Sequence, residues 1–224
     1  MKIRYLHLWD ATPAEAGRLQ KQLSSQVRLE PLARWPKLAA GLDCAFSPDK
    51  KYIAAAAVLL RLKNFEVIET ASAVLPVQFP YIPGLLSFRE APVCIAAVEK
   101  LRRRPDVFLI DGQGLAHRRR LGLACHLGLF FDLPTIGCAK SRLIGQYENL
   151  PIQKGASAPL TDKGEIIGSV VRTRTDVKPL FISPGHRITF EQSVEVVLAC
   201  CTRYRLPEPT RLAHQLVGRL KHQL

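Results

Sequence analysis

The chain has 224 residues, of which 47% are hydrophobic and 23% are charged, a composition typical of a globular protein with a sizeable core. An excess of 32 Lys and Arg over 19 Asp and Glu gives a formal net charge of +13, which favours a polyanionic partner, nucleic acid ahead of an anionic membrane surface. The longest apolar run, 53–60, is too short to cross a bilayer, and the charged N-terminus is unlike a signal peptide. We therefore expect a cytoplasmic protein without a membrane partner.

The first predicted helix follows the tetrapeptide Thr12-Pro13-Ala14-Glu15, a capping box with proline at the first helical position. We expect it to run from about Pro13 to Val27 as a packing helix within the N-terminal segment 1–34. Three apolar segments joined by short polar turns then follow, at 37–46, 52–60 and 65–75. This pattern predicts an antiparallel meander.

Asp43 interrupts the first of these apolar segments. A buried carboxylate without a partner would cost on the order of several kcal/mol. The residue therefore has a compensating cation or metal, or it is a turn or edge aspartate bonded to the backbone. Both interpretations stay open for this residue alone.

A proline-rich stretch, FPYIPGLLSFREAP at 79–92, follows the meander. Its prolines stiffen the backbone around Tyr81 and Ile82. A rigid apolar wedge of this kind can unstack bases, although the tyrosine of such a loop can also pack on the protein's own surface. The pattern from Ser87 to Glu90 predicts a second capping box, which would give Glu90 a purely structural role.

The run Val107–Ile110 is apolar without alternation, which predicts a strand buried on both faces. It ends on Asp111, and the glycines at 112 and 114 let the backbone turn sharply and let a ligand approach. An acid would thus stand at the carboxyl end of a central strand, where open α/β sheets bind their ligands. A crossover helix over 115–131 and a short strand over 134–139 would complete a βαβ unit.

Lys140 ends that last strand, so it would lie beside Asp111 as a phosphate contact or as a solvated loop lysine. Further on, we expect a flexible excursion at 144–165, a hairpin-like pair at 164–174 and 179–183, and a helix capped by Thr189. The last predicted helix buries Leu212, Leu216 and Leu220. The helical period would place His214 on its opposite, exposed side.

This order of elements predicts an α/β fold with an RNase H-like mixed sheet, three antiparallel strands plus parallel strands flanked by helices, in one domain over 1–224. In that topology the middle of the first strand neighbours the end of the fourth, so Asp43 and Asp111 would face each other. Two carboxylates that share a site repel unless a divalent cation lies between them. Mg²⁺ is the natural ion because it takes one or two carboxylates and completes its shell with water and phosphate.

Five segments together resemble the endonuclease V family: PYIPGLLSFREAP at 80–92, DGQGLAH at 111–117, PTIGCAKSRLIG at 134–145, SPGHRIT at 183–189 and RLPEPTRLAH at 205–214. They occur in the family's order, and the match spreads from about residue 35 to 216. The resemblance implies a Mg²⁺-dependent nuclease, for which Mn²⁺ could substitute. It would recognise deoxyinosine, the product of adenine deamination, in damaged DNA. It would cut the second phosphodiester bond 3′ to that base and leave a 3′-hydroxyl and a 5′-phosphate.

The resemblance also implies roles for individual residues. Those that match the family's catalytic positions are Asp43, Glu90, Asp111 and His214, with the two aspartates as metal ligands. Those that would bind DNA are Tyr81, as the wedge that fills the gap left by the flipped base, with Ile82, Pro83, His117 and Lys140. The backbone that would line the base pocket lies around Gly84, Leu86, Gly112 and Gly114. One departure is Arg118, which stands where the family commonly has proline and would add phosphate affinity.

Two alternative hypotheses stay open. The substrate could be inosine in RNA, because contacts to a 2′-hydroxyl cannot be read from the sequence. The protein could also be a nucleic-acid binder without catalytic activity, which would bind without Mg²⁺ and never nick. A nucleotide-binding enzyme is disfavoured because the sequence has neither a GxGxxG nor a Walker A motif. We expect the protein to be a monomer.

Overall fold

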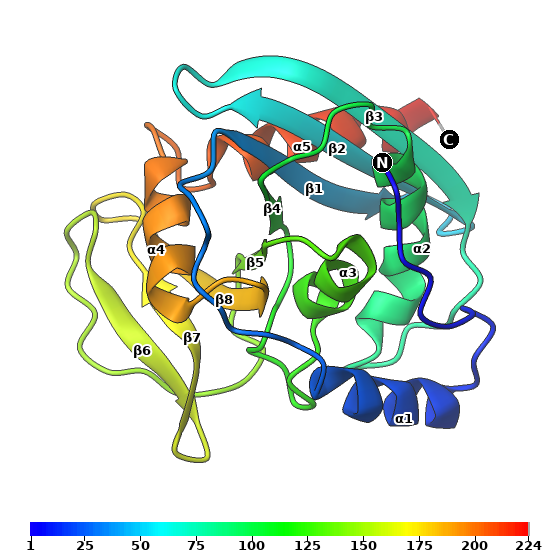
Figure 1. Ribbon diagram of the computed structural model, residues 1–224, viewed down its shortest axis with the longest axis horizontal. Helices are drawn as coiled ribbons and strands as arrows, with labels where there is room; N and C mark the ends of the chain where they lie inside the picture. The colour runs from blue at the N-terminus through cyan, green and yellow to red at the C-terminus, as the bar shows by residue number, and fades with distance from the viewer. Residues whose placement is uncertain (224) are drawn as a thin grey trace.

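The computed structural model describes residues 1–223 and contains one eight-stranded sheet, with the strand order β3-β2-β1-β4-β5-β8-β7-β6 (Figure 1). The predicted α/β class, with antiparallel strands joined to parallel strands, is confirmed. The domain prediction extends to residue 224, which lies outside the described residues. No helix within 1–223 is both long enough and apolar enough to span a membrane.

The antiparallel half of the sheet is the predicted meander of β1 (Leu38–Phe46), β2 (Tyr52–Arg61) and β3 (Glu66–Pro76). Successive residues of β2 point to opposite faces, and both faces are covered. Ala55 and Ala57 pack in a cluster with α2 (Leu86–Glu99), whereas Ala54 and Ala56 pack against α5 (Glu208–Leu220). This two-sided burial explains why the strand is continuously apolar.

The parallel centre of the sheet places β4 (Val107–Ile110) between β1 and β5 (Thr135–Ala139). Leu42 of β1 pairs with Ile110, and the amide of Asp111 donates to the Leu42 carbonyl at 3.0 Å. The middle of the first strand and the end of the fourth are therefore neighbours, as predicted.

The crossover helix α3 spans only Leu123–Phe131, so the prediction that it begins at residue 115 is wrong. The preceding residues turn instead, because the amide of Gly122 donates to the Gly114 carbonyl at 3.0 Å and that of Arg120 to the His117 carbonyl at 2.8 Å. These turns fold the chain back against the end of β4.

The remaining strands extend the sheet beyond β5 to the left of Figure 1. β8 (Leu180–His186) pairs antiparallel with β5 and with β7 (Glu165–Val171), which in turn pairs with β6 (Ser157–Asp162). The hairpin-like pair predicted at 164–174 and 179–183 corresponds to β7 and β8. The excursion predicted at 144–165 is wrong for its second half, because β6 pairs antiparallel with β7 there, with a shift in register between Leu160 and Thr161.

Helices cover both faces of the sheet. α2 and α3 pack on one face, and α4 (Phe190–Ala199) and α5 pack on the other. The side chain of Thr189 caps α4, as predicted. The final turn η1 (Lys221–Gln223) follows α5.

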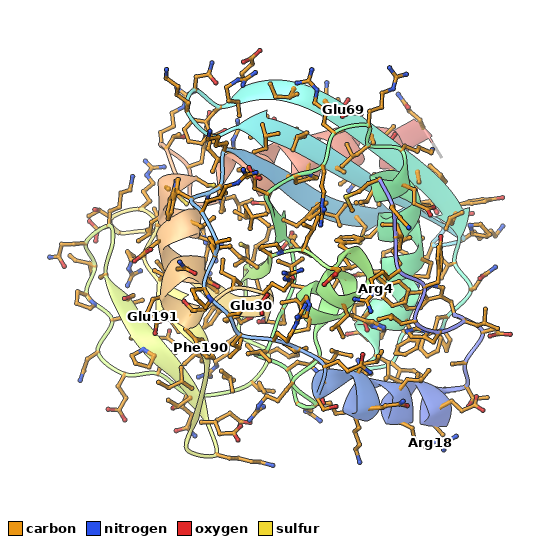
Figure 2. The ribbon with its side chains drawn as sticks, in the orientation of Figure 1. Arg4, Arg18, Glu30, Glu69, Phe190 and Glu191 are labelled. Atoms are coloured by element: carbon orange, nitrogen blue, oxygen red, sulfur yellow. The ribbon has the colours of Figure 1, made fainter. Side chains whose placement is uncertain are left out.

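The N-terminal segment contains α1 (Pro13–Ser24), and its first residues lie beside α3. The capping box at Thr12 and Glu15 is confirmed, although α1 ends at Ser24, before the expected Val27. The amide of Arg4 donates to the Phe130 carbonyl at 2.8 Å, and Figure 2 shows the Arg4 side chain beside α3. The segment between α1 and β1 is held similarly, since Glu30, also labelled in Figure 2, pairs with Arg187 at 2.7 Å.

The buried stripe of α5 differs from the prediction. Ala213 and Val217 are its buried apolar positions at mid-helix, whereas Leu212 and Leu216 are only partly buried. The helix lies so close to β1 that a Cβ atom at Gly41 would sit 1.9 Å from the carbonyl oxygen of Pro209. Small side chains at the contact allow this approach. Because α5 is rotated about its axis so that Ala213 faces the sheet, the next residue, His214, lies towards the sheet edge.

Candidate active site

Asp43 and His214 form the first contact of the site. Asp43 lies on β1 with 7% of its side chain exposed, and its Oδ2 is 2.7 Å from Nδ1 of His214 on α5. The ring of His214 remains 56% exposed, as the helical period predicts, although its Nδ1 also contacts a buried carboxylate. A helix face can be open to solvent and still reach a buried carboxylate at its border.

Asp111 joins this pair from the end of β4. One ligand atom from each of Asp43, Asp111 and His214 lies within 4.8 Å of the other two. Lys140, directly after β5, forms an ion pair with Oδ2 of Asp111. The prediction that Lys140 lies beside Asp111 is therefore confirmed.

Arg205 is a neighbour of this ion pair that sequence reasoning missed. Its guanidinium donates to the carbonyl of Lys140 at 2.7 Å and to that of Pro179 at 2.8 Å. It thereby fixes the backbone that carries Lys140. The signal was its place at the start of the segment RLPEPTRLAH, of which only the final histidine was singled out.

Glu90 is buried in the first turns of α2, near both aspartates. The predicted capping box is wrong, because α2 begins at Leu86 with Leu85 as its N-cap, and the Ser87 hydroxyl bonds Nδ1 of His126 at 3.0 Å instead. Burial, followed by the negative charges of Asp43 and Asp111, raises the pKa of Glu90 to about 8. Glu90 is therefore the third carboxyl group of the site.

Electrostatics at the site fit a cation. Burial and the charge of Asp111 raise the pKa of Asp43, opposed by its hydrogen bond to His214. A divalent ion between Asp43 and Asp111 would remove this repulsion, and carboxylate oxygens are the donors that hard cations prefer. The donor set thus fits a metal ion.

A cavity of about 140 Å³ is lined in part by Gly112 and Gln113, the two residues that follow Asp111. Predicted residues that line it are Tyr81, Ile82, Pro83, Gly84, Leu86, Gly112 and His117. Gly114 does not line it, because its amide donates to the Ser183 hydroxyl at 2.8 Å and a Cβ there would meet the Pro184 carbonyl at 2.1 Å. Lining residues that the sequence analysis missed are Gln20, Ser87, Gln113, Leu121, Gly122, Leu123 and Leu143.

Two features of the cavity's entrance suit a planar ligand. Tyr81 is 70% exposed, held out between Pro80 and Pro83. α2 starts at the cavity without a side-chain cap. The amide of Phe88 donates to the Leu85 carbonyl at 3.1 Å, which leaves the backbone N–H groups of Leu86 and Ser87 as the first-turn donors for a ligand carbonyl.

A carboxylate within β1 and another directly after β4, with a lysine and a histidine beside them, are the chemical equipment of a nuclease, and this is the class that the fold and site define. Comparison with known families gives the particular family. The profile of Endonuclease V matches residues 21–215, and the chain belongs to this family of endonucleases.

Individual relatives agree over nearly the whole chain. Endonuclease V of Nostoc punctiforme is 49% identical over 219 residues, which cover 97% of this chain and 99% of that protein. The crystal structure of Endonuclease V from Streptomyces avermitilis has a TM-score of 0.91 at 39% identity and covers 98% of this chain and 97% of its own. Endonuclease V of Ciona intestinalis, in complex with a 24mer DNA containing an inosine followed by a ribo-adenosine, has a TM-score of 0.78 at 26% identity, covering 92% and 96%.

Proposed function

We propose that this endonuclease recognises deoxyinosine in damaged DNA and hydrolyses the second phosphodiester bond on its 3′ side. The observation that carries the proposal is the cluster of Asp43, Asp111 and His214 within 4.8 Å, beside a cavity that the exposed Tyr81 borders. The inosine-containing DNA bound to the Ciona relative supports the choice of base.

In this proposal, Asp43 and Asp111 hold Mg²⁺, which Mn²⁺ could replace. The bound ion would polarise the scissile phosphate and lower the pKa of a water. Glu90, the third carboxyl group of the site, would orient a water molecule or a second ion. Lys140, which pairs with Asp111, would exchange part of that contact for a phosphate oxygen.

His214 has a defined proton geometry. An ionised Asp43 only accepts hydrogen bonds, so Nδ1 of His214 donates to it at 2.7 Å and the neutral ring carries its free lone pair on Nε2. Nε2 can therefore take a proton from the attacking water. As the water oxygen bonds phosphorus, the bond to O3′ breaks, and O3′ takes a proton from a solvent water, which yields a 3′-hydroxyl beside a 5′-phosphate.

Base recognition is assigned to the cavity. Flipping a base out of a duplex costs a few kcal/mol, and less for a mismatched base. Tyr81 offsets part of that cost by stacking in the vacated position, with Ile82 and Pro83 behind it. His117 and the backbone at Gly84, Leu86 and Gly112 border the cavity that would receive the base.

A second candidate is inosine in RNA. The DNA in the Ciona complex carries a ribo-adenosine directly after the inosine, so a ribose at that position is compatible with binding to that relative. The same catalytic residues would serve either substrate.

The test is nicking of a labelled duplex with a single deoxyinosine, beside the matching inosine RNA, with Mg²⁺ or with EDTA. Asp43→Ala and Asp111→Ala serve as inactive variants. A Mg²⁺-dependent nick one nucleotide beyond the inosine supports the proposal, and product length reports its position. Cutting of the RNA alone would show that the substrate is inosine in RNA. Binding without any nick would refute the catalytic assignment.

A further inference from the structure

A largely buried hydrogen-bond network joins residues of the cavity wall to Arg119. Nε of Arg119 donates to Oε1 of Gln20 at 2.6 Å, and an Nη of the same guanidinium donates to the Gly84 carbonyl at 2.8 Å. Gln20 is 1% exposed, and its amide in turn donates to the Leu121 carbonyl at 3.3 Å and the Ser87 hydroxyl at 3.4 Å. One arginine thus connects α1 with the loop that precedes α2.

The inward direction of Gln20 follows from the helix. Figure 2 shows Arg18, two residues earlier on α1, extending away from the protein. Residues two apart on a helix lie on roughly opposite sides, so Gln20 faces the protein. A glutamine held there without water would be costly unless its amide were paired, and Arg119, Leu121 and Ser87 supply the partners.

His117 fills the second acceptor position of the Gly84 carbonyl. The backbone amide of Arg119 donates to Nδ1 of His117 at 3.2 Å, so the hydrogen of the neutral ring is on Nε2, which lies 3.1 Å from the Gly84 oxygen. Burial and the charge of Arg119 lower the pKa of His117 to about 4, which keeps the ring neutral. Both lone pairs of the carbonyl are then occupied.

Gly84 is the point at which the loop 80–84 is anchored. It adopts φ +81°, a left-handed conformation that favours glycine. In the described part of the chain, the hydrogen bonds that link 80–84 to segments beyond α2 are the two at the Gly84 carbonyl. The loop carries Tyr81 at one end and borders the start of α2 at the other, so its orientation sets both the wedge and the cavity wall.

We propose that Arg119 is a positioning residue for base recognition, because it holds the Gly84 carbonyl and so fixes the loop 80–84. The inference rests on the proposed function and deepens it. Arg119 acts on the preference for inosine over an unmodified purine, and the phosphodiester chemistry at Asp43 and Asp111 does not depend on it. Lysine cannot replace it fully, because one ammonium group does not span Gln20 and Gly84 with the geometry of a planar guanidinium.

The chain offers a matched control in the neighbouring Arg118. Its side chain is exposed and makes no hydrogen bond or ion pair within residues 1–223. Arg118→Met removes the same charge as Arg119→Met but leaves both hydrogen bonds to the Gly84 carbonyl, and the one to Gln20, in place. Loss of phosphate affinity alone would therefore weaken binding to inosine and unmodified DNA equally.

The experiment measures dissociation constants for a deoxyinosine duplex and the same duplex with deoxyadenosine, together with the nicking rate at saturating enzyme. For Arg119→Met we expect inosine binding to weaken about ten- to hundredfold, the effect of an unpaired buried group. Binding to the unmodified duplex should follow the Arg118→Met control, and the saturated rate should stay within about threefold of wild type. Arg119→Lys should recover part of the preference.

A second measurement uses the protein alone. Amide hydrogen exchange at residues 81–87 should be faster in Arg119→Met than in wild type, with exchange in β4 unchanged. Equal losses for both duplexes, or unchanged exchange in the loop, would overturn the proposal. If the wild-type enzyme nicks neither inosine substrate, the proposed function fails, and the exchange measurement still decides whether Arg119 holds the loop. Gln20→Met provides a second variant if Arg119→Met does not fold.

Discussion

Oδ2 of Asp43 and Nδ1 of His214 are 2.7 Å apart in space and 171 residues apart in sequence. Asp43 is contributed by a central strand and His214 by a helix docked on that strand. The bond therefore exists only when α5 is seated, and it ties the proposed proton transfer to a packing contact between two elements.

His214 is expected to contribute to the nicking rate through its Nε2 atom, the proposed proton acceptor. His214→Asn places an amide near the position of Nδ1 and keeps a bond to Asp43, but it lacks a group at Nε2. We expect both His214→Asn and His214→Ala to slow single-turnover nicking by about 10²- to 10⁴-fold. The free energy of unfolding should change by less than about 1 kcal/mol, since more than half of the ring is exposed. A wild-type rate in His214→Asn would restrict the residue to orienting Asp43.

Metal binding should stabilise the folded protein. A ligand that binds only the folded state at a hundred times its dissociation constant adds about 2.7 kcal/mol, so Mg²⁺ should raise the thermal midpoint and EDTA should reverse this. Asp111→Asn should abolish both the shift and nicking. Glu191→Gln, which alters an exposed carboxylate on α4 (Figure 2), is the control and should keep the shift.

Tyr81 is expected to affect DNA binding without affecting stability. Its side chain is 70% exposed, so Tyr81→Ala should change the free energy of unfolding by less than about 0.5 kcal/mol. Loss of a stacking ring should weaken inosine binding by about 1–3 kcal/mol. Tyr81→Phe keeps the ring and should bind as wild type does. A loss of equal size in both variants would point to the hydroxyl instead.

A substitution at Gly41 tests whether the packing of α5 on β1 affects catalysis. A Cβ atom there would lie 1.9 Å from the Pro209 carbonyl oxygen, so Gly41→Ala must push α5 away from β1. We expect a loss of about 1–3 kcal/mol in stability and a nicking rate reduced towards that of His214→Ala. Gly218→Ala, on the same helix with no atom within 4 Å of the added Cβ, should not lower stability, since alanine favours a helix, and should leave the nicking rate unchanged.

Buried histidines should make the protein labile to acid. Burial, with a smaller effect of Arg28, lowers the pKa of His186 to about 4 against the opposing charge of Asp132, whereas the unfolded residue titrates near 6.5. The unfolded state therefore binds more protons between these values, and stability falls as pH drops from about 6.5 to 4, by up to about 1.4 kcal/mol per pH unit for each such proton.

His186→Asn isolates this contribution. An asparagine oxygen can accept from the Arg28 amide in place of Nδ1, which lies 3.2 Å from that nitrogen. Urea unfolding at several pH values gives the dependence of the unfolding free energy on pH. Between about pH 6.5 and 4 this slope should correspond to about one bound proton fewer than in wild type. An unchanged slope would mean that His186 is protonated in the folded state.

Short sequence patterns predicted the elements whose residues interact within a few positions of one another. The unbroken apolar run before Asp111 and the glycines after it identified a central strand and its turn. The capping box at Thr12 identified the start of α1 because each of its bonds spans three residues. Relations between distant segments needed either a topology or a family resemblance, and both supplied the pairing of Asp43 with Asp111.

Other parts of the site left no local signal. The same Ser-x-x-Glu pattern that caps a helix elsewhere lies inside α2 at Ser87 and Glu90, because burial against His126 and the aspartates determines their partners. His214 was placed on an exposed face, since helical period does not reveal which strand runs beneath its edge. Arg119 and Gln20 are 99 residues apart, and neither belongs to a pattern that predicts the other.

The position of α5 in the chain bears on when the enzyme becomes active during its synthesis. Every strand of the sheet is made before residue 208, and Asp43, Glu90 and Asp111 can be in place while α5 is still inside the ribosome. His214 cannot reach Asp43 until that helix has emerged and docked at Gly41. A nascent chain without α5 therefore lacks the proposed proton-transfer pair, and the proposed mechanism predicts nuclease activity towards nearby nucleic acid only after α5 has left the exit tunnel.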